Sequence, residues 1–255
     1  MSSPTWTPAA LAFELAPYQG GAWRLVEAQH KISTLKLVDT AAEQALLEEV
    51  LEDHKPAYPE GCEGLHYLLK TPFRYGAAYP HGSRFRRAGR TPGVFYAAER
   101  PQTAVAEMAY YRLLFFAESP GTPWPANPAE FTAFRVEIAT DRHLDLTRPP
   151  LSTDAALWTA LSDYSPCQDL ADQARAAQVQ ALRYLSVRDP GHGCNLALLT
   201  PTAFAKPKPT ATRTWRLRLS ATGVQALCEA PRAVMDFGRE AFSADGRLAG
   251  MVWQR

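Results

Sequence analysis

The sequence predicts an α+β protein, with a single mixed, largely antiparallel sheet core and flanking helices. In FTAFRVEIA, 131–139, every second residue from Phe134 is apolar, which is the period of a half-buried strand. In TWRLRL, 214–219, a similar alternation runs up to a turn at Gly223 that can lead into an antiparallel partner. The segment 103–116 has the length and composition of a helix. Strands and helices are therefore expected to alternate around one sheet.

The N-terminal part is predicted to contain a helix that starts after Thr40. Thr40 and Glu43 have the spacing of a capping box, and the apolar residues that follow make AAEQALLEEVLED amphipathic. This helix ends near Lys55-Pro56, where the Pro- and Gly-rich PAYPEGCEG follows. We divide the chain into 1–70, an extension with a helix packed on the core, and 71–255, which ends in a hairpin and tail. The extension is too short for its own core, so we expect one globule.

The rest of the chain alternates short strands and helices. The central NLALL, 195–199, is short and apolar after its first residue, as a strand covered on both faces would be. KPKPTATRT, 206–214, is predicted to be an exposed loop, and the last fifteen or so residues carry no usable pattern. The further predicted elements are a strand at 94–97 and helices at 154–161 and 167–182.

Composition and charge exclude several classes of protein. The 255 residues are 46% hydrophobic and carry a net charge of +1, so the chain as a whole has no attraction for nucleic acid or anionic membranes. No basic leader precedes an apolar run, and no eighteen consecutive residues are apolar, so we expect a cytoplasmic protein. The four cysteines show no CxxC or paired-histidine spacing, which predicts neither a metal site nor a disulfide framework.

A run of four arginines is the strongest local charge feature. They lie at positions 84, 86, 87 and 90, between and beside Gly82 and Gly89, and guanidinium groups match phosphate oxygens in a bidentate fork. A charge run of this kind is more often a solvated loop. Two further polar residues follow at element boundaries, Tyr96 and Glu107, where side chains can converge on one cleft.

Four ordered blocks resemble the signature of the RES-domain toxins, a family named for an arginine, a glutamate and a serine. The resemblance runs from about Phe73 to about Leu199, and it implies the toxin of a RES-Xre type II toxin-antitoxin system with an Xre-like antitoxin as partner. The leading segment, 22–40, is similar to the longer, ParT-type branch of mono-ADP-ribosyltransferases. The family is similar in fold to diphtheria-toxin-like ADP-ribosyltransferases and consumes NAD. The blocks are Gly82-Ser-Arg-Phe85, Gly93-Val-Phe-Tyr-Ala-Ala-Glu99, Thr103-Ala-Val-Ala-Glu107 and Arg183-Tyr-Leu-Ser186-Val-Arg-Asp.

The resemblance implies an active-site set of Arg84, Tyr96, Glu107 and Ser186. Cleavage of NAD passes through an oxocarbenium-like ribosyl cation, which the carboxylate of Glu107 would stabilise. Arg84 would bind the pyrophosphate or ribose oxygens, and Tyr96 would offer a ring face to nicotinamide and a phenol to anchor it. Ser186 would orient Glu107 or donate to the dinucleotide.

Three residues outside the four blocks have a lower rank. Arg74 in TPFRYG and Arg24 and Gln29 in WRLVEAQH could reach the same cleft, although a loop ion pair or cap is the commoner role. We include Arg74 among the residues expected to bind NAD.

One difference from the ADP-ribosyltransferases that modify arginine limits which group can accept ADP-ribose. Those enzymes carry a glutamate or glutamine two residues before the catalytic glutamate, and here that position is Val105. This argues against arginine as the acceptor, but it leaves open modification of another protein side chain and destruction of NAD by water or phosphate. Nucleic-acid binding through the arginine run, or docking of an acidic partner there, are alternatives of another class.

Overall fold

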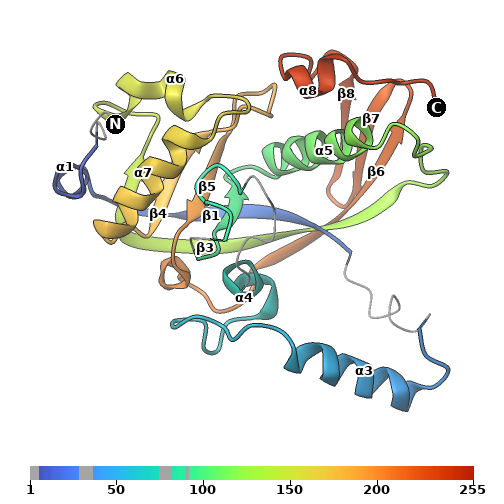
Figure 1. The fold of residues 1–255 in the computed structure, drawn as a ribbon, viewed down its shortest axis with the longest axis horizontal. Helices are drawn as coiled ribbons and strands as arrows, with labels where there is room; N and C mark the ends of the chain where they lie inside the picture. The colour runs from blue at the N-terminus through green and yellow to red at the C-terminus, as the bar shows by residue number, and fades with distance from the viewer. Residues whose placement is uncertain (1–5, 29–36, 75–81, 90–91) are drawn as a thin grey trace.

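A single sheet organises the computed structural model, which describes residues 6–28, 37–74, 82–89 and 92–255 (Figure 1). The described strands follow the order β1-β2-β5-β4-β3-β6-β7-β8, and β1 also pairs with β3. Among the described strands, only β3 and β4 pair in parallel, so the predicted mixed, largely antiparallel α+β class is confirmed. The strands are β1 (Ala16–Glu27), β2 (Phe95–Ala98), β3 (Ala129–Asp145), β4 (Ala181–Leu185), β5 (Cys194–Leu198), β6 (Ala211–Ser220), β7 (Gly223–Glu229) and β8 (Arg232–Gly238).

The long strand β3 belongs to two parts of the sheet. One of its edges pairs with β1 from end to end, and the other pairs first with β6 and then with β4. The strands β1, β2, β5, β4 and β3 consequently form a closed ring, from which β6, β7 and β8 extend. The candidate functional site lies beside this ring.

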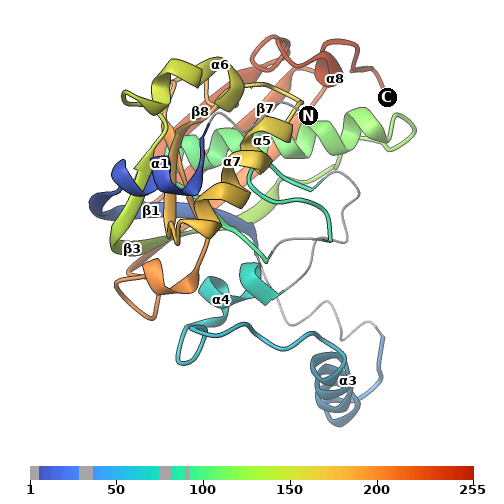
Figure 2. The same ribbon diagram turned by 60° about the vertical axis from the view of Figure 1, so that its left-hand side comes forward.

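Helices cover the sheet on different sides (Figures 1 and 2). The central helix α5 packs on β1 and contacts α8, within one apolar cluster that includes Trp215 and Phe131. A second cluster lies under α7, and a third lies between α4 and the ring. The helices are α1 (Pro8–Phe13), α3 (Ala41–Asp53), α4 (Tyr67–Arg74), α5 (Pro101–Glu118), α6 (Ala155–Trp158), α7 (Ser165–Ala176) and α8 (Gly246–Ala249), with 3-10 turns at η1 (Leu151–Asp154) and η2 (Pro201–Ala203).

Several predicted elements are present, but three strands were not predicted. The helix at 103–116 is α5, the strand at 195–199 is β5, and the turn at Gly223 joins β6 to β7. The strands β1, β4 and β8 were not predicted. The helix expected at 154–161 is shorter, since a 3-10 turn precedes α6.

The helix predicted over 167–182 is wrong in its last part, after Ala176. The helix α7 ends at Ala176, and Gln178 takes a left-handed φ of 56° before β4 begins at Ala181. The stretch ALRYL suits a helix locally. It forms a strand because β3 and β5 pair with it on both edges, and these ladders override the local preference.

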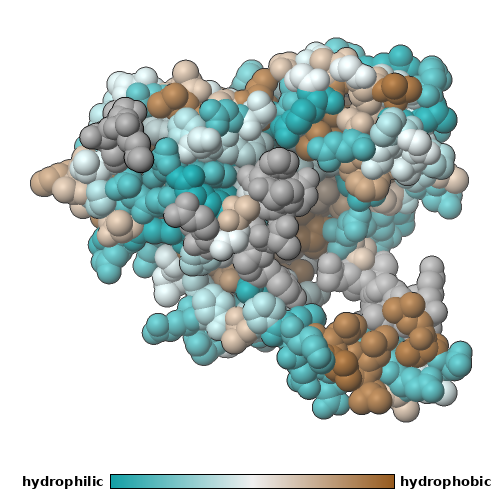
Figure 3. All heavy atoms as spheres, in the orientation of Figure 1, coloured by the Kyte–Doolittle hydropathy of each residue, from teal (hydrophilic) through white to brown (hydrophobic). Residues whose placement is uncertain are grey.

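The helix α3 stands apart from the body of the protein (Figures 1 and 2). The capping box is present, with Glu43 N–H donating to Thr40 Oγ1 and Thr40 N–H donating to the Glu43 carboxylate. None of its residues is buried, and apolar side chains such as Leu46 and Val50 are exposed (Figure 3). A polar contact from Arg74 links its end to α4. The division of the chain at residue 70 remains a prediction.

The described helices include no segment with the length and hydrophobicity needed to cross a bilayer.

Candidate functional site

A cavity of about 330 Å³ opens between the ring of strands and α5. Its walls come from β1, the 82–86 turn, β2, the first half of α5, Tyr164, the end of β4 with the loop that follows, and β5. Three of the four residues predicted as the active-site set, Arg84, Tyr96 and Glu107, line it. The fourth, Ser186, lies directly behind Glu107 and is 1% exposed. The tertiary structure therefore brings all four together.

The carboxylate of Glu107 projects from the second turn of α5 and is held by two donors. The Ser186 hydroxyl donates to its Oε1 across 2.7 Å, and the Asn195 side-chain amide donates to the same oxygen across 2.6 Å. Among the described residues, none donates to Oε2. The carboxylate thus has a fixed orientation and keeps one oxygen for a ligand.

A tight loop after β4 holds Ser186. Its Oγ accepts hydrogen bonds from the backbone N–H groups of Arg188 and Asp189, and its own N–H donates to the carbonyl of Gly193. Asp189 accepts from the hydroxyl of Thr103, at the start of α5, across 2.7 Å. Because this loop is tied to the same helix that carries Glu107, the serine and the glutamate are positioned by one rigid unit.

Arg84 is buried at the cavity wall, where it is 8% exposed. Its guanidinium donates to the carbonyls of Trp158 at 2.7 Å and Ala160 at 3.0 Å, and it lies over the ring of Tyr164. The turn that carries it needs glycine at position 82, where φ is +63° and a Cβ would lie 2.2 Å from a backbone carbonyl oxygen. This arginine is thus part of the cavity and not of a solvated basic loop.

The hydroxyl of Tyr96 holds the arginine turn. It accepts a hydrogen bond from Phe85 N–H at 3.0 Å and shares another with Ser83 Oγ at 2.9 Å. The phenol is thus engaged inside the protein, and the expected anchoring of nicotinamide by it remains a prediction. The Tyr96 side chain still lines the cavity.

Arg74 does not line the cavity, in contrast to the prediction. Its guanidinium instead donates to Glu52, to the carbonyl of Pro56 and to the hydroxyl of Tyr58. The reason is geometric, since Arg74 lies at the last residue of α4 and next to the end of α3.

Of the other polar residues considered from the sequence, one lines the cavity and one does not. Arg24 lines the cavity and donates to the carbonyl of Tyr96 at 2.8 Å. Arg87 does not line the cavity and forms ion pairs with Asp169 and Asp172 on α7. Gln29 and Arg90 lie outside the described residues.

Further residues of the site were not predicted. Asn195, Arg188 and Tyr164 all line the cavity. Asn195 is the first residue of NLALL, a stretch that was interpreted only as a core strand. The signal for Arg188 was its place two residues after Ser186 in the fourth block.

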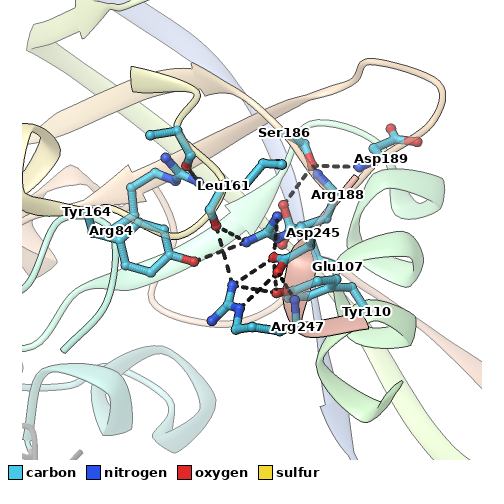
Figure 4. Close-up of polar contacts among 11 residues, drawn as sticks. Arg84, Glu107, Tyr110, Leu161, Tyr164, Ser186, Arg188, Asp189, Asp245 and Arg247 are labelled. Carbon is cyan, nitrogen blue, oxygen red and sulfur yellow. Dashed lines mark hydrogen bonds and ion pairs between the residues drawn. The ribbon is translucent and has the colours of Figure 1, made fainter. Parts of the chain in front are cut away.

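A buried polar cluster supports one side of the cavity (Figure 4). Arg188 pairs with Asp245 at 3.2 Å, and its guanidinium lies 4.0 Å from the ring centre of Tyr110. Asp245, which is 3% exposed, also accepts from the Tyr110 hydroxyl at 2.7 Å and from Arg247 at 2.8 Å. Burial raises the pKa of Asp245, but the bonds from Arg247 and Tyr110 outweigh it and hold that pKa well below its usual range. Through Asp245, the C-terminal segment thereby holds Arg188 in place at the cavity.

The charged residues of the cavity favour a ligand that is negatively charged overall and carries a positive charge at one end. Three arginines and one glutamate line it. Of these arginines, Arg24 and Arg84 make no ion pair with any residue of the described part of the chain. Burial lowers the pKa of Arg24 to about 10, so it remains cationic at neutral pH. A phosphate-bearing ligand would supply the missing negative charge.

Comparison with known proteins identifies one family. The family model described as "RES domain" matches residues 58–220, which is more than half of the chain. No curated protein matches the sequence. Among solved structures, the chain is similar to one in the crystal structure of the M. tuberculosis MbcT-MbcA toxin-antitoxin complex, with 15% identity and a TM-score of 0.45 over 79% of this chain and 90% of that one.

Proposed function

Since the chain belongs to the RES-domain family, we propose that it is the toxin of a toxin-antitoxin pair, that it cleaves the nicotinamide-ribose bond of NAD, and that it transfers ADP-ribose to a target protein. The observation that carries this proposal is the carboxylate of Glu107, held by Ser186 and Asn195 at the wall of an arginine-lined cavity.

The reaction needs a carboxylate against the ribose. Nicotinamide leaves as the neutral base with the electron pair of the C–N bond, and the ribosyl C1′ develops positive charge. The acceptor then bonds to C1′ and releases a proton. Glu107 stabilises the developing cation electrostatically, and because it is already oriented, no reorganisation is needed during the reaction. Its free Oε2 is available to the substrate.

The arginines account for binding of the dinucleotide. NAD carries two negative charges on its pyrophosphate, and Arg24 and Arg84 offer positive charge that no described carboxylate neutralises. Tyr96 and Tyr164 contribute aromatic side chains to the same walls, against which a nicotinamide or adenine ring can pack.

A second acceptor class, water or phosphate, is favoured by one observation. Val105, two residues before Glu107, is fully buried in the apolar cluster under α5. No polar side chain at that position can position a protein acceptor. Hydrolysis or phosphorolysis of NAD is therefore the alternative outcome of the same bond cleavage.

The alternative of a basic surface for nucleic acid or an acidic partner has less support. Arg84 is buried and Arg87 is paired with two aspartates, so these two arginines form no exposed basic patch.

A toxin of this kind requires restraint in the cytoplasm of its own host, which an Xre-like antitoxin would provide.

The test is release of nicotinamide from NAD by the purified chain, followed by chromatography. Parallel reactions contain buffer alone, buffer with phosphate, and buffer with a host protein extract and labelled NAD. Labelled protein supports ADP-ribosyl transfer, whereas free ADP-ribose or ADP-ribose phosphate supports the alternative. No nicotinamide in any reaction, from a folded chain, contradicts the proposal.

A further inference from the structure

Asn195 lies at the cavity, on a strand that is paired on both edges. It pairs with Ala98 of β2 on one side and with Tyr184 of β4 on the other, so its backbone is fixed by two ladders. Its side chain is 4% exposed and lines the cavity beside Glu107. Pairing on both edges fixes the face of the sheet on which the side chain lies, which is the face that carries the cavity.

The chemistry of the pair determines which way the amide points. A carboxylate oxygen only accepts hydrogen bonds, so the nitrogen of Asn195 must face Glu107, and it does so at 2.6 Å. The amide oxygen Oδ1 then faces away from Glu107. It is buried and has no hydrogen-bond partner among the described residues. A buried acceptor without a donor costs stability, so the chain carries this cost unless a ligand supplies the donor.

Two acceptors of neighbouring side chains are thereby left for a ligand. Oε1 of Glu107 already accepts from Ser186 and Asn195, whereas Oε2 has no described donor. Oδ1 of Asn195 is the second open acceptor. A ligand that satisfies both must present donors, and hydroxyl groups on a ribose ring are such donors.

We infer that Asn195 has two roles in the reaction proposed above, on which this inference rests: its Nδ2 positions the Glu107 carboxylate, and its Oδ1 accepts a hydrogen bond from a ribose hydroxyl of the substrate. The second role makes it a substrate-binding residue. It also gives the site a means of selecting a ribosyl ligand with its hydroxyl groups intact, because a deoxy sugar leaves the buried oxygen unpaired.

The test combines a variant with altered substrates. Asn195→Ala and wild type are assayed for nicotinamide release from NAD and from two analogues that lack the 2′- or the 3′-hydroxyl of the nicotinamide ribose. On NAD the variant is expected to lose about tenfold or more in kcat/KM. On the analogue that lacks the bonded hydroxyl, variant and wild type should differ by less than on NAD, because the ribose contact is already absent and only the bond from Nδ2 to Glu107 is lost. Asn127→Ala, at an exposed asparagine, is the matched control and should leave all values unchanged.

Two readouts separate this role from a structural one. Thermal unfolding of Asn195→Ala should be close to wild type, because the substitution also removes an unpaired acceptor. In Asn195→Asp, a second carboxylate beside Glu107 should move the acid limb of the pH–rate profile to higher pH. A fall in stability that accounts for the whole loss of activity, with an unchanged profile, overturns the inference.

The outcomes also separate this inference from the proposed function. If wild type releases nicotinamide and Asn195→Ala matches it, or if the variant loses the same factor on NAD and on both analogues, the inference about Asn195 is wrong and the function stands. If wild type releases none, the proposed function is wrong. Calorimetry with ADP-ribose then decides the binding role, since equal affinity of wild type and Asn195→Ala overturns it and weaker binding by the variant supports it.

Discussion

Ser186 donates its hydroxyl hydrogen to Oε1 of Glu107 across 2.7 Å, although the two residues are 79 positions apart in the chain. The serine follows β4 and the glutamate lies on α5, so the contact depends on how the ring of strands packs against that helix. The same hydroxyl accepts two backbone N–H groups of its own loop. One side chain thus couples the fold of a loop to the orientation of a carboxylate.

Glu107→Gln is expected to reduce nicotinamide release by at least about 100-fold, because the amide keeps the shape but removes the charge that stabilises the ribosyl cation. Glu118→Gln, at the exposed end of the same helix, is the matched control and should retain full activity. Steady-state assays of both chains decide this. Activity of Glu107→Gln within about tenfold of wild type would exclude the electrostatic role.

Ser186→Ala is expected to affect both stability and activity. Two buried backbone N–H groups lose their acceptor, so the free energy of unfolding should fall by about 1–3 kcal/mol. Glu107 loses one of its two donors, and activity should fall by about tenfold or more. Ser243→Ala, at an exposed serine, should change neither by more than about 0.5 kcal/mol. Urea unfolding with parallel assays measures both, and a fully active, fully stable Ser186→Ala chain contradicts the role.

Arg84→Lys is expected to weaken NAD binding by about tenfold, because an ammonium group cannot reproduce a planar fork that bonds two carbonyls and faces the cavity. The same change at Arg87, whose ion pairs with α7 an ammonium can keep, is the control, and it should matter less. Calorimetric titration with NAD measures both affinities. Equal binding by Arg84→Lys and wild type would mean that NAD does not use the guanidinium.

Asp245→Asn is expected to lower the free energy of unfolding by about 3 kcal/mol at neutral pH, because Arg188 is left buried without its carboxylate. The pKa of Asp245 is depressed in the folded chain, so its contribution is fully present above the unfolded-state pKa of about 3.9 and is lost as the pH falls through the lower folded value. Wild type and variant should therefore converge in acid.

Chemical unfolding at several pH values tests this convergence. Asp236→Asn, at an exposed aspartate of β8, is the control for loss of a charge and should have little effect. A difference between wild type and Asp245→Asn that persists unchanged below pH 3 would contradict the assignment.

An antitoxin that restrains this protein is expected to compete with NAD. A cavity with Arg24, Arg84 and Arg188 in its walls will also accept a carboxylate, so an acidic side chain or a C-terminal carboxylate of the antitoxin can occupy it as a mimic of the dinucleotide. The complex should form with the inactive Glu107→Gln chain, and excess NAD should weaken it measurably in calorimetry. Equal affinity at saturating NAD would mean that restraint acts away from the cavity.

The sequence by itself determined the elements that have a local signal. The period of 131–139, the apolar helix around Glu107 and the short central strand at 195–199 each correspond to an observed element, because their side-chain spacing reports burial directly. The ordered motifs also placed Arg84, Tyr96, Glu107 and Ser186 in one site, and the structure brings these four together.

Only the tertiary structure decided which polar groups meet. Arg74 contacts the end of α3 and not the cavity, and Tyr96 uses its hydroxyl to hold the Arg84 turn. Asn195 reaches Glu107 across 88 positions, and Asp245 reaches Tyr110 across 135. Such contacts depend on strand register and on helix packing, which local spacing does not encode. For the same reason ALRYL, helical by its own preference, became the strand β4 between two partners that lie elsewhere in the chain.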